Sequence, residues 1–176
     1  MRTSRTLLCP QCRSPCQIWY NSPVTKIEEK WALTRETVGE DRLSIVMPLY
    51  KLAAETRGNL IAVAELFESH GIPTELVPVD DGSGDGTDAV LEEFSNRRIA
   101  EASNWKCVTI KPVVCKRNGG KGAALRAGYE ASTGRYVMLL DGDLDIHPKQ
   151  TPCFFEEMVT KGADIVVGSK RHANSV

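Results

Sequence analysis

Short apolar segments alternate with longer helical patterns from Leu43 onward, and this alternation limits the possible folds more than any other feature. Each apolar run has the length of a strand, and the pattern after it repeats at roughly helical spacing. Parallel strands joined by crossover helices produce such an alternation. The sequence therefore predicts a Rossmann-like α/β domain over residues 43–176, with a mostly parallel sheet and flanking helices.

The expected elements follow each other in the order strand, helix, strand. We expect strands at 43–47, 75–79, 108–114, 136–140 and 164–167, and helices at 59–69, 87–98, from about 121, and at 149–160. Segment 136–140 is apolar enough to predict a central strand buried on both faces.

Residues 1–42 differ from the rest of the chain because they show no clear repeating apolar face. We expect them to form a short N-terminal appendage. Cys9, Cys12 and Cys16 supply three thiolates, but no obvious fourth ligand lies nearby, and a zinc ribbon normally has a second Cys-x-x-Cys pair. A partial zinc-ribbon-like segment holding Zn²⁺ and a group of reduced cytosolic thiols both stay open.

The charge balance and the hydropathy argue against nucleic-acid binding and against a membrane-spanning segment. The 22 lysines and arginines nearly cancel the 23 aspartates and glutamates, which gives no reason to expect nucleic-acid binding. No apolar run approaches the roughly 20 residues that cross a bilayer. We also expect no secretion signal at the start of this sequence. We therefore expect a cytoplasmic chain without a transmembrane span.

Unusual residues gather where four predicted strands or their following loops end. They are Pro48 to Tyr50, Asp80 to Ser83, Lys116 to Gly122, and Asp141 to Asp145. Because ligands of open α/β sheets bind beyond the carboxyl ends of the strands, these four loops predict one binding site.

Asp141, Asp143 and Asp145 follow the apolar segment 136–140 at alternate positions. In extended chain, alternate side chains point the same way, which would put three carboxylates on one side. Mg²⁺ or Mn²⁺ prefers oxygen ligands and can take its remaining ligands from a diphosphate. An acidic surface turn is the alternative, but the preceding apolar strand, the internal Gly142 and the third aspartate favour a metal site.

The acidic run 80–87 nearly fits the spacing of an EF-hand calcium loop. The segment before it, 75–79, contains Pro78 and β-branched valines and does not resemble an EF-hand helix, which favours a strand-to-helix turn. In such a turn Asp81 would accept hydrogen bonds from a nucleobase imide or a ribose. A purely structural capped turn is the alternative.

Asn118-Gly119-Gly120-Lys121-Gly122 opens a predicted helix, so its backbone amides and Lys121 can meet diphosphate oxygens. The spacing is not that of a Walker A loop. A glycine-rich turn with a solvated lysine is an equally open interpretation.

Four motifs, in this order, resemble the signature of family 2 glycosyltransferases with the GT-A fold, and the resemblance covers about residues 43–169. They are Pro48-Leu49-Tyr50, Val79-Asp80-Asp81-Gly82-Ser83, Gly120-Lys121-Gly122 and Leu140-Asp141-Gly142-Asp143-Leu144-Asp145. Within the family, the last motif is similar to that of polyprenyl-phosphate sugar transferases such as dolichyl-phosphate mannose synthase.

The resemblance implies an inverting transfer of a hexose from a nucleoside-diphosphate sugar to a polyprenyl (dolichyl-type) phosphate at a membrane surface, assisted by Mg²⁺ or Mn²⁺. It implies that Asp141, Asp143 and Asp145 hold the metal. The residues expected to bind the nucleotide-sugar are Pro48, Tyr50, Asp81, Lys121, Asp141 and Asp143.

Two departures from the family pattern bear on this expectation. Lys51 and Leu52 stand where the family commonly has asparagine and glutamate. The family also continues past Gly168 into an acceptor-binding segment, so we expect the glycosyltransferase domain 43–176 to be incomplete at its C-terminus. No catalytic base can be assigned in this chain.

The missing base favours a lipid-phosphate acceptor, because a phosphate with a second pKa near ~6 needs little deprotonation. Two alternatives stay open. One is a glycosyltransferase of polysaccharide or cell-envelope synthesis with a hydroxyl acceptor, which would need a positioned base. The other is a non-catalytic nucleotide-sugar binding module.

Overall fold

The computed structural model describes residues 7–8, 15–16, 24–95 and 104–168. Contacts within the chain divide it into two units, residues 38–149 and residues 1–37 with 150–176. This grouping by contacts differs from the boundary predicted after residue 42. It does not test the predicted functional domains, which stay a prediction.

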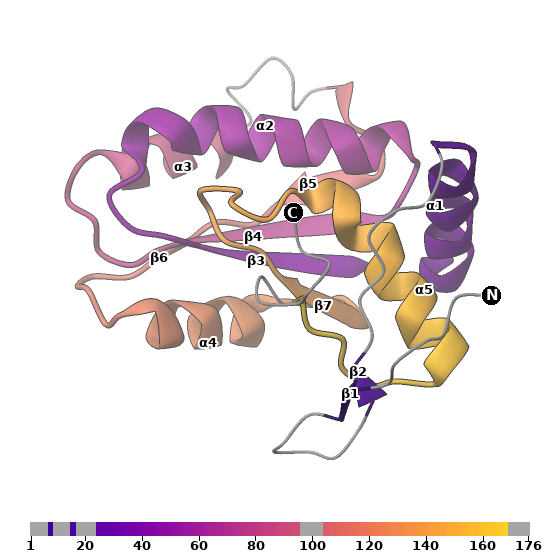
Figure 1. The fold of residues 1–176 in the computed structure, drawn as a ribbon. Coiled ribbons are helices and arrows are strands. Elements are labelled where there is room, and N and C mark those ends of the chain that lie inside the picture. The colour runs from indigo at the N-terminus through magenta and orange to yellow at the C-terminus, as the bar shows by residue number, and fades with distance from the viewer. Residues whose placement is uncertain (1–6, 9–14, 17–23, 96–103, 169–176) are drawn as a thin grey trace. The chain divides into compact units, whose positions relative to one another are not determined.

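The larger unit is a parallel sheet with helices on both faces. Its strands are β3 (Leu43–Leu49), β4 (Thr74–Asp80), β5 (Val108–Ile110), β6 (Val113–Val114) and β7 (Tyr136–Leu139). They lie in the order β5-β4-β3-β7, with β6 also paired to β4, and every pairing is parallel. The helices are α2 (Ala53–Ser69), α3 (Thr87–Ser95) and α4 (Lys121–Ala131). Figure 1 shows α2 and α3 on one face and α4 on the other, so the predicted α/β fold class is confirmed.

β3 and β4 form the centre of this sheet because both are nearly continuous apolar runs. Every residue of β4 is buried, and so is every residue of β3 except the half-buried Pro48. Strands covered by helices on both faces have this composition. Their register pairs Leu49 with Asp80, so the two strands end together at the same edge.

Three expectations about strands were wrong for the described residues. β7 lies at the end of the strand order, and Leu139 is 58% exposed, so this strand is not buried on both faces. Segment 164–167 forms no strand, and its Ile165 is 79% exposed. The strand expected at 108–114 is split into β5 and β6 around Pro112, which has no N–H for a ladder.

The start of one helix also differs clearly from the expectation. α2 begins at Ala53, earlier than the predicted start at residue 59. α3 begins at Thr87 as predicted and is described up to Ser95, so the predicted end at residue 98 lies outside the described residues.

The smaller unit contains α1 (Val24–Val38) and α5 (Thr151–Lys161), and the 3₁₀ turn η2 (Pro148–Gln150) leads into α5. It also contains the antiparallel strands β1 (Leu7–Leu8) and β2 (Pro15–Cys16). A 15-residue helix therefore lies in the segment where the sequence showed no clear apolar repeat.

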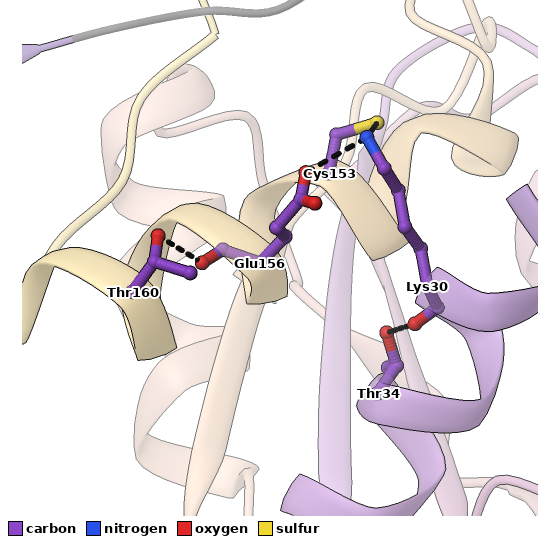
Figure 2. Close-up of polar contacts among 5 residues, drawn as sticks. All are labelled: Lys30, Thr34, Cys153, Glu156 and Thr160. Atoms are coloured by element: carbon purple, nitrogen blue, oxygen red, sulfur yellow. Dashed lines mark hydrogen bonds and ion pairs between the residues drawn. The ribbon is translucent and has the colours of Figure 1, made fainter. Parts of the chain in front are cut away.

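A buried lysine joins the two helices of the smaller unit, as Figure 2 shows. Lys30 of α1 lies 2.7 Å from the Glu156 carboxylate of α5 and donates to Cys153 Sγ at 3.8 Å. Burial alone would lower the pKa of Lys30, but the hydrogen bond to Glu156 and the nearby negative charge raise it overall. The ammonium therefore stays charged where it links α1 to α5.

A buried carboxylate ties together the amino-terminal end of the larger sheet. Glu75 of β4 accepts hydrogen bonds from the Ser44 hydroxyl (2.8 Å), the Thr133 N–H (2.9 Å) and the Thr133 hydroxyl (3.1 Å). Burial would raise the pKa of Glu75, but these donors lower it overall. The ionised side chain thus connects β3, β4 and the turn before β7.

We expect Glu75→Gln to lower the free energy of unfolding at neutral pH by about 1–3 kcal/mol, because an amide nitrogen cannot accept these hydrogen bonds. The folded pKa of Glu75 lies below its unfolded value. Its contribution is therefore complete above the unfolded value of about 4.3 and is lost as the pH falls through the folded value.

Urea denaturation from neutral to acidic pH measures this contribution. The parent protein should lose stability below about pH 4.3 more steeply than the Glu75→Gln variant. Glu55→Gln, at an exposed glutamate of α2, is the matched control and should keep the parent pH profile. Equal acid slopes for the parent and the Glu75 variant would contradict the assignment.

Candidate functional site

A cleft of about 280 Å³ opens at the carboxyl ends of β3, β4 and β7, beside the start of α4. Side chains and backbone from four separate loops line it. These residues are Pro48, Leu49, Tyr50, Leu52, Asp81, Asn118, Gly120, Lys121, Ala124, Asp141, Gly142 and Asp143. All of them belong to the larger unit. The cleft therefore lies where ligands of open α/β sheets bind.

Six of the seven residues singled out from the sequence line this cleft. They are Pro48, Tyr50, Asp81, Lys121, Asp141 and Asp143, whereas Asp145 is not among the lining residues. Their predicted roles in holding a nucleotide-sugar are not tested by this placement.

Asp81 holds the glycine-rich loop that precedes α4. Its two carboxylate oxygens accept hydrogen bonds from the Gly119 N–H at 2.9 Å and the Gly120 N–H at 2.8 Å. The side chain is almost completely buried. Since each carboxylate oxygen can accept more than one hydrogen bond, Asp81 retains acceptor capacity toward the cleft. Its immediate structural effect is to place Lys121 at the first position of the helix.

The turn after β4 is fastened to the end of β3. Asp80 accepts hydrogen bonds from both the N–H and the hydroxyl of Ser83, and the Ser83 oxygen accepts one from the Lys51 N–H at 3.0 Å. Lys51 has a φ of 56°, which is uncommon for a residue other than glycine. The chain after Tyr50 is therefore held in an unusual conformation beside the cleft.

The EF-hand interpretation of run 80–87 is wrong. The element that enters the run is the strand β4, whereas an EF-hand needs a helix there. Asp85 instead caps α3, accepting hydrogen bonds from the Thr87 hydroxyl at 2.6 Å and the Thr87 N–H at 3.0 Å. The hydrogen bond from the Thr87 hydroxyl is the main reason that the pKa of Asp85 is lowered.

The three aspartates after β7 do not lie in extended chain, so the expected alternation of side chains is wrong. A turn forms in which the Leu144 N–H donates to the Asp141 carbonyl at 3.0 Å, and Leu144 has a φ of 57°. The Asp143 carboxylate accepts a hydrogen bond from the Asp145 N–H at 3.1 Å. The turn leaves Asp141 and Asp143 on the cleft and takes Asp145 out of its lining.

Lys121 reaches across the cleft to the acidic turn. Its ammonium lies 2.5 Å from Asp141 Oδ1, although the two residues come from different elements. The Lys121 side chain is 61% exposed and that of Asp141 is 38% exposed, so solvent or a ligand can reach both. The sequence placed both residues in the site but did not predict this ion pair.

Asn59 of α2 also shapes the site, although no sequence motif pointed to it. Its side-chain amide donates to the Gly142 carbonyl at 2.8 Å. An added Cβ at Gly142 would overlap Leu49 and would lie 2.8 Å from the Pro48 carbonyl oxygen. The acidic turn is thus held tightly against α2 and the end of β3.

The carboxylates of the cleft fit a metal that arrives with its substrate. Within the part of the chain that the structure describes, no three Asp, Glu, His or Cys side chains are grouped to hold a metal ion. Mg²⁺, however, is usually held by one or two carboxylates together with substrate phosphates and water. Asp141 and Asp143, on one turn facing one cleft, supply such a donor set.

The predicted zinc site cannot be compared with the structure. Cys9 and Cys12 lie outside the described residues, and Cys16 is in β2. The Zn²⁺ hypothesis for the N-terminal cysteines therefore stays a prediction.

A parallel α/β sheet with an acidic, lysine-containing cleft at its strand ends defines a ligand-binding domain of the doubly wound class. The model of glycosyl transferase family 2 matches residues 44–176, and the chain belongs to that family. The family predicted from the four sequence motifs is thereby confirmed.

Two curated relatives are identical to this chain at about a third of the aligned positions. Dodecaprenyl-phosphate galacturonate synthase from Rhizobium johnstonii is 29% identical over 139 residues, which are 79% of this chain and 39% of the relative. Undecaprenyl-phosphate 4-deoxy-4-formamido-L-arabinose transferase from Pseudomonas paraeruginosa is 36% identical over 131 residues, which are 74% of this chain and 36% of the relative. The match thus spans less than two fifths of each relative.

Among solved structures, the chain is similar to the mannosyltransferase PcManGT from Pyrobaculum calidifontis in complex with GDP-Man and Mn²⁺. It is 21% identical, with a TM-score of 0.47, and the match covers 73% of this chain and 39% of that one.

Among the helices that the structure describes, none is both long enough and apolar enough to cross a membrane.

Proposed function

We propose that this chain is the donor-binding part of a glycosyltransferase that moves a hexose from a nucleoside-diphosphate sugar to a polyprenyl phosphate, with inversion and with the help of Mg²⁺ or Mn²⁺. The observation that carries the proposal is the common cleft formed by four loops. Family membership and the names of the two polyprenyl-phosphate relatives support it.

The nucleoside is assigned to the β3 side of the cleft. Tyr50 is 46% exposed there, and the Lys51 ammonium lies 5.3 Å from the centre of its ring. An exposed aromatic ring held beside a buried carboxylate can pack against a base while Asp81 accepts a hydrogen bond from the base or the ribose. Pro48 also lines the cleft.

The diphosphate is assigned to the opposite side, between Lys121 and the acidic turn. A metal ion held by Asp141 and Asp143 would supply Lewis-acid stabilisation of the leaving nucleoside diphosphate. Lys121 adds a positive charge on the same path, because it starts α4 with its side chain over the cleft. The first N–H groups of α4 favour negative charge at the same place.

A lipid phosphate suits this site as the nucleophile because it is already largely ionised at neutral pH. A hydroxyl acceptor would need a general base, and none can be assigned among the described residues of the cleft. Use of a lipid acceptor implies association with a membrane surface, which we include in the proposal.

The test is transfer by the full-length protein from radiolabelled UDP- and GDP-hexoses, with Mn²⁺ and detergent-solubilised polyprenyl phosphate. We expect label to enter the lipid product only with the phosphorylated acceptor and to stop when a chelator removes the metal. Unphosphorylated polyprenol is the matched control and should accept no sugar.

Two outcomes would replace the proposal. Tight donor binding without turnover would identify a non-catalytic binding module. Transfer to hydroxyl acceptors that is indifferent to added polyprenyl phosphate would identify a glycosyltransferase of polysaccharide or cell-envelope synthesis.

A further inference from the structure

The Lys121–Asp141 ion pair places a cation on one of the two carboxylates of the acidic turn that line the cleft. The ammonium lies 2.5 Å from Asp141 Oδ1, and both residues line the cleft. The Asp143 carboxylate accepts a hydrogen bond from the backbone N–H of Asp145 at 3.1 Å. The positive charge of Lys121 is therefore directed to Asp141.

The position of Lys121 is set by the fold. Asp81 binds the N–H groups of Gly119 and Gly120, which fixes the chain immediately before Lys121. The acidic turn opposite is held by Asn59 through the Gly142 carbonyl. Because both backbones are fastened, only the flexible lysine side chain needs to move for the ion pair to open.

A divalent cation and the lysine ammonium compete for the same oxygen of Asp141. A metal ion that binds Asp141 must displace the Lys121 ammonium. The displaced ammonium then lies beside the metal ion, and the two positive charges repel each other. If a diphosphate enters at the same time, it offers oxygens to both the metal and Lys121, so neither positive charge is left without a partner. Metal and diphosphate should therefore bind cooperatively.

We propose that Lys121 acts as an exchangeable counterion of Asp141: it occupies the carboxylate in the metal-free protein and transfers to the donor diphosphate when a divalent cation binds. This inference rests on the proposed function, since it takes the ligand to be a nucleoside diphosphate with its metal. It adds that the two ligands bind in a coupled manner and that Lys121 sets the coupling.

The test is Mn²⁺ binding, measured by the electron paramagnetic resonance signal of free Mn²⁺, with and without UDP or GDP. For the parent protein we expect weak binding of Mn²⁺ alone and binding at least about tenfold tighter with a saturating nucleoside diphosphate. In Lys121→Met, Mn²⁺ alone should bind about tenfold tighter than in the parent, because the competing ammonium is gone. The tightening by nucleotide should shrink.

Two further variants make the measurement specific. Lys116→Met removes the same charge from an exposed lysine of the preceding loop that does not line the cleft, and it should leave Mn²⁺ binding unchanged. In Asp141→Asn, the additional Lys121→Met change should no longer tighten Mn²⁺ binding, since the shared carboxylate is absent. Circular dichroism checks that each variant is folded.

The outcomes separate this inference from the proposed function. If the parent binds Mn²⁺ with nucleotide, but Lys121→Met binds Mn²⁺ alone no tighter than the parent does, the counterion role is wrong and metal-dependent donor binding survives. If no variant binds Mn²⁺ with either nucleotide, both are overturned.

Discussion

Asp143→Ala is expected to weaken Mn²⁺-dependent binding of the nucleoside-diphosphate sugar by about 100-fold or more, because it removes one of the few protein ligands proposed for the metal. Asp143 faces the cleft and is exposed, so the loss should not come from unfolding. Isothermal titration of UDP- and GDP-sugars with and without Mn²⁺ measures the effect.

Asp88→Ala provides the matched control for Asp143. It removes a carboxylate from the first turn of α3, outside the cleft lining, and donor affinity should stay within about twofold of the parent. If Asp143→Ala leaves the donor affinity unchanged, the proposed metal site is wrong.

Asp145→Ala tests the turn itself. In the described geometry Asp145 lies outside the cleft lining, so its loss should weaken donor binding less than the loss of Asp143. An equal loss would show that the turn rearranges on ligand binding and restores the three-carboxylate arrangement expected from the sequence.

Gly82→Ala is expected to lower the free energy of unfolding by about 3 kcal/mol, the second large effect. Gly82 has a φ of 63°, and left-handed backbone costs a residue with a Cβ about 1–2 kcal/mol. An added Cβ would also lie 2.5 Å from the Arg117 carbonyl carbon and 2.6 Å from the Asn118 nitrogen, and such overpacking costs a further 1–3 kcal/mol or so.

Gly84→Ala isolates the effect of the close contact. Gly84 has nearly the same φ, 65°, but no atom lies within 4 Å of an added Cβ. It should therefore show only the backbone cost of about 1–2 kcal/mol in chemical denaturation. Equal destabilisation by the two substitutions would contradict the packing of the β4 turn against residues 117–118.

The same pair of glycine variants connects stability to the site. The added methyl group of Gly82→Ala would displace the backbone at residues 117–118. The next two residues, Gly119 and Gly120, donate hydrogen bonds to Asp81. We therefore expect Gly82→Ala to weaken donor binding more than Gly84→Ala does, even well below the temperature at which either variant unfolds.

Much of the fold could be predicted from local sequence patterns. β3 and β4 are apolar runs of strand length, which made them recognisable as strands, but their central position was not predicted. Segment 136–140 is equally apolar and was predicted to be the central strand, yet β7 lies at the end of the strand order. A short apolar run has the same pattern at the centre and at the edge of a sheet, and its neighbours decide which of the two it occupies.

The site was predictable to a similar degree. Four residues could be assigned to one cleft because the carboxyl ends of parallel strands lie at one edge of a sheet: Pro48, Asp81, Lys121 and Asp143. The conformation after β7 could not be predicted in the same way. The turn at Leu144 depends on one positive φ and on the hydrogen bond from Asn59 to Gly142, two residues that are 83 positions apart.

The sequence by itself determined the alternation of strands and helices over residues 43–139, the family, and which four loops line a common cleft, because apolar periodicity and turn chemistry are properties of neighbouring residues. Only the tertiary structure decided that Asp81 fastens the glycine loop, that Asp145 leaves the cleft lining, and that Lys121 pairs with Asp141. These contacts join residues from different elements, and their geometry depends on how the whole sheet packs.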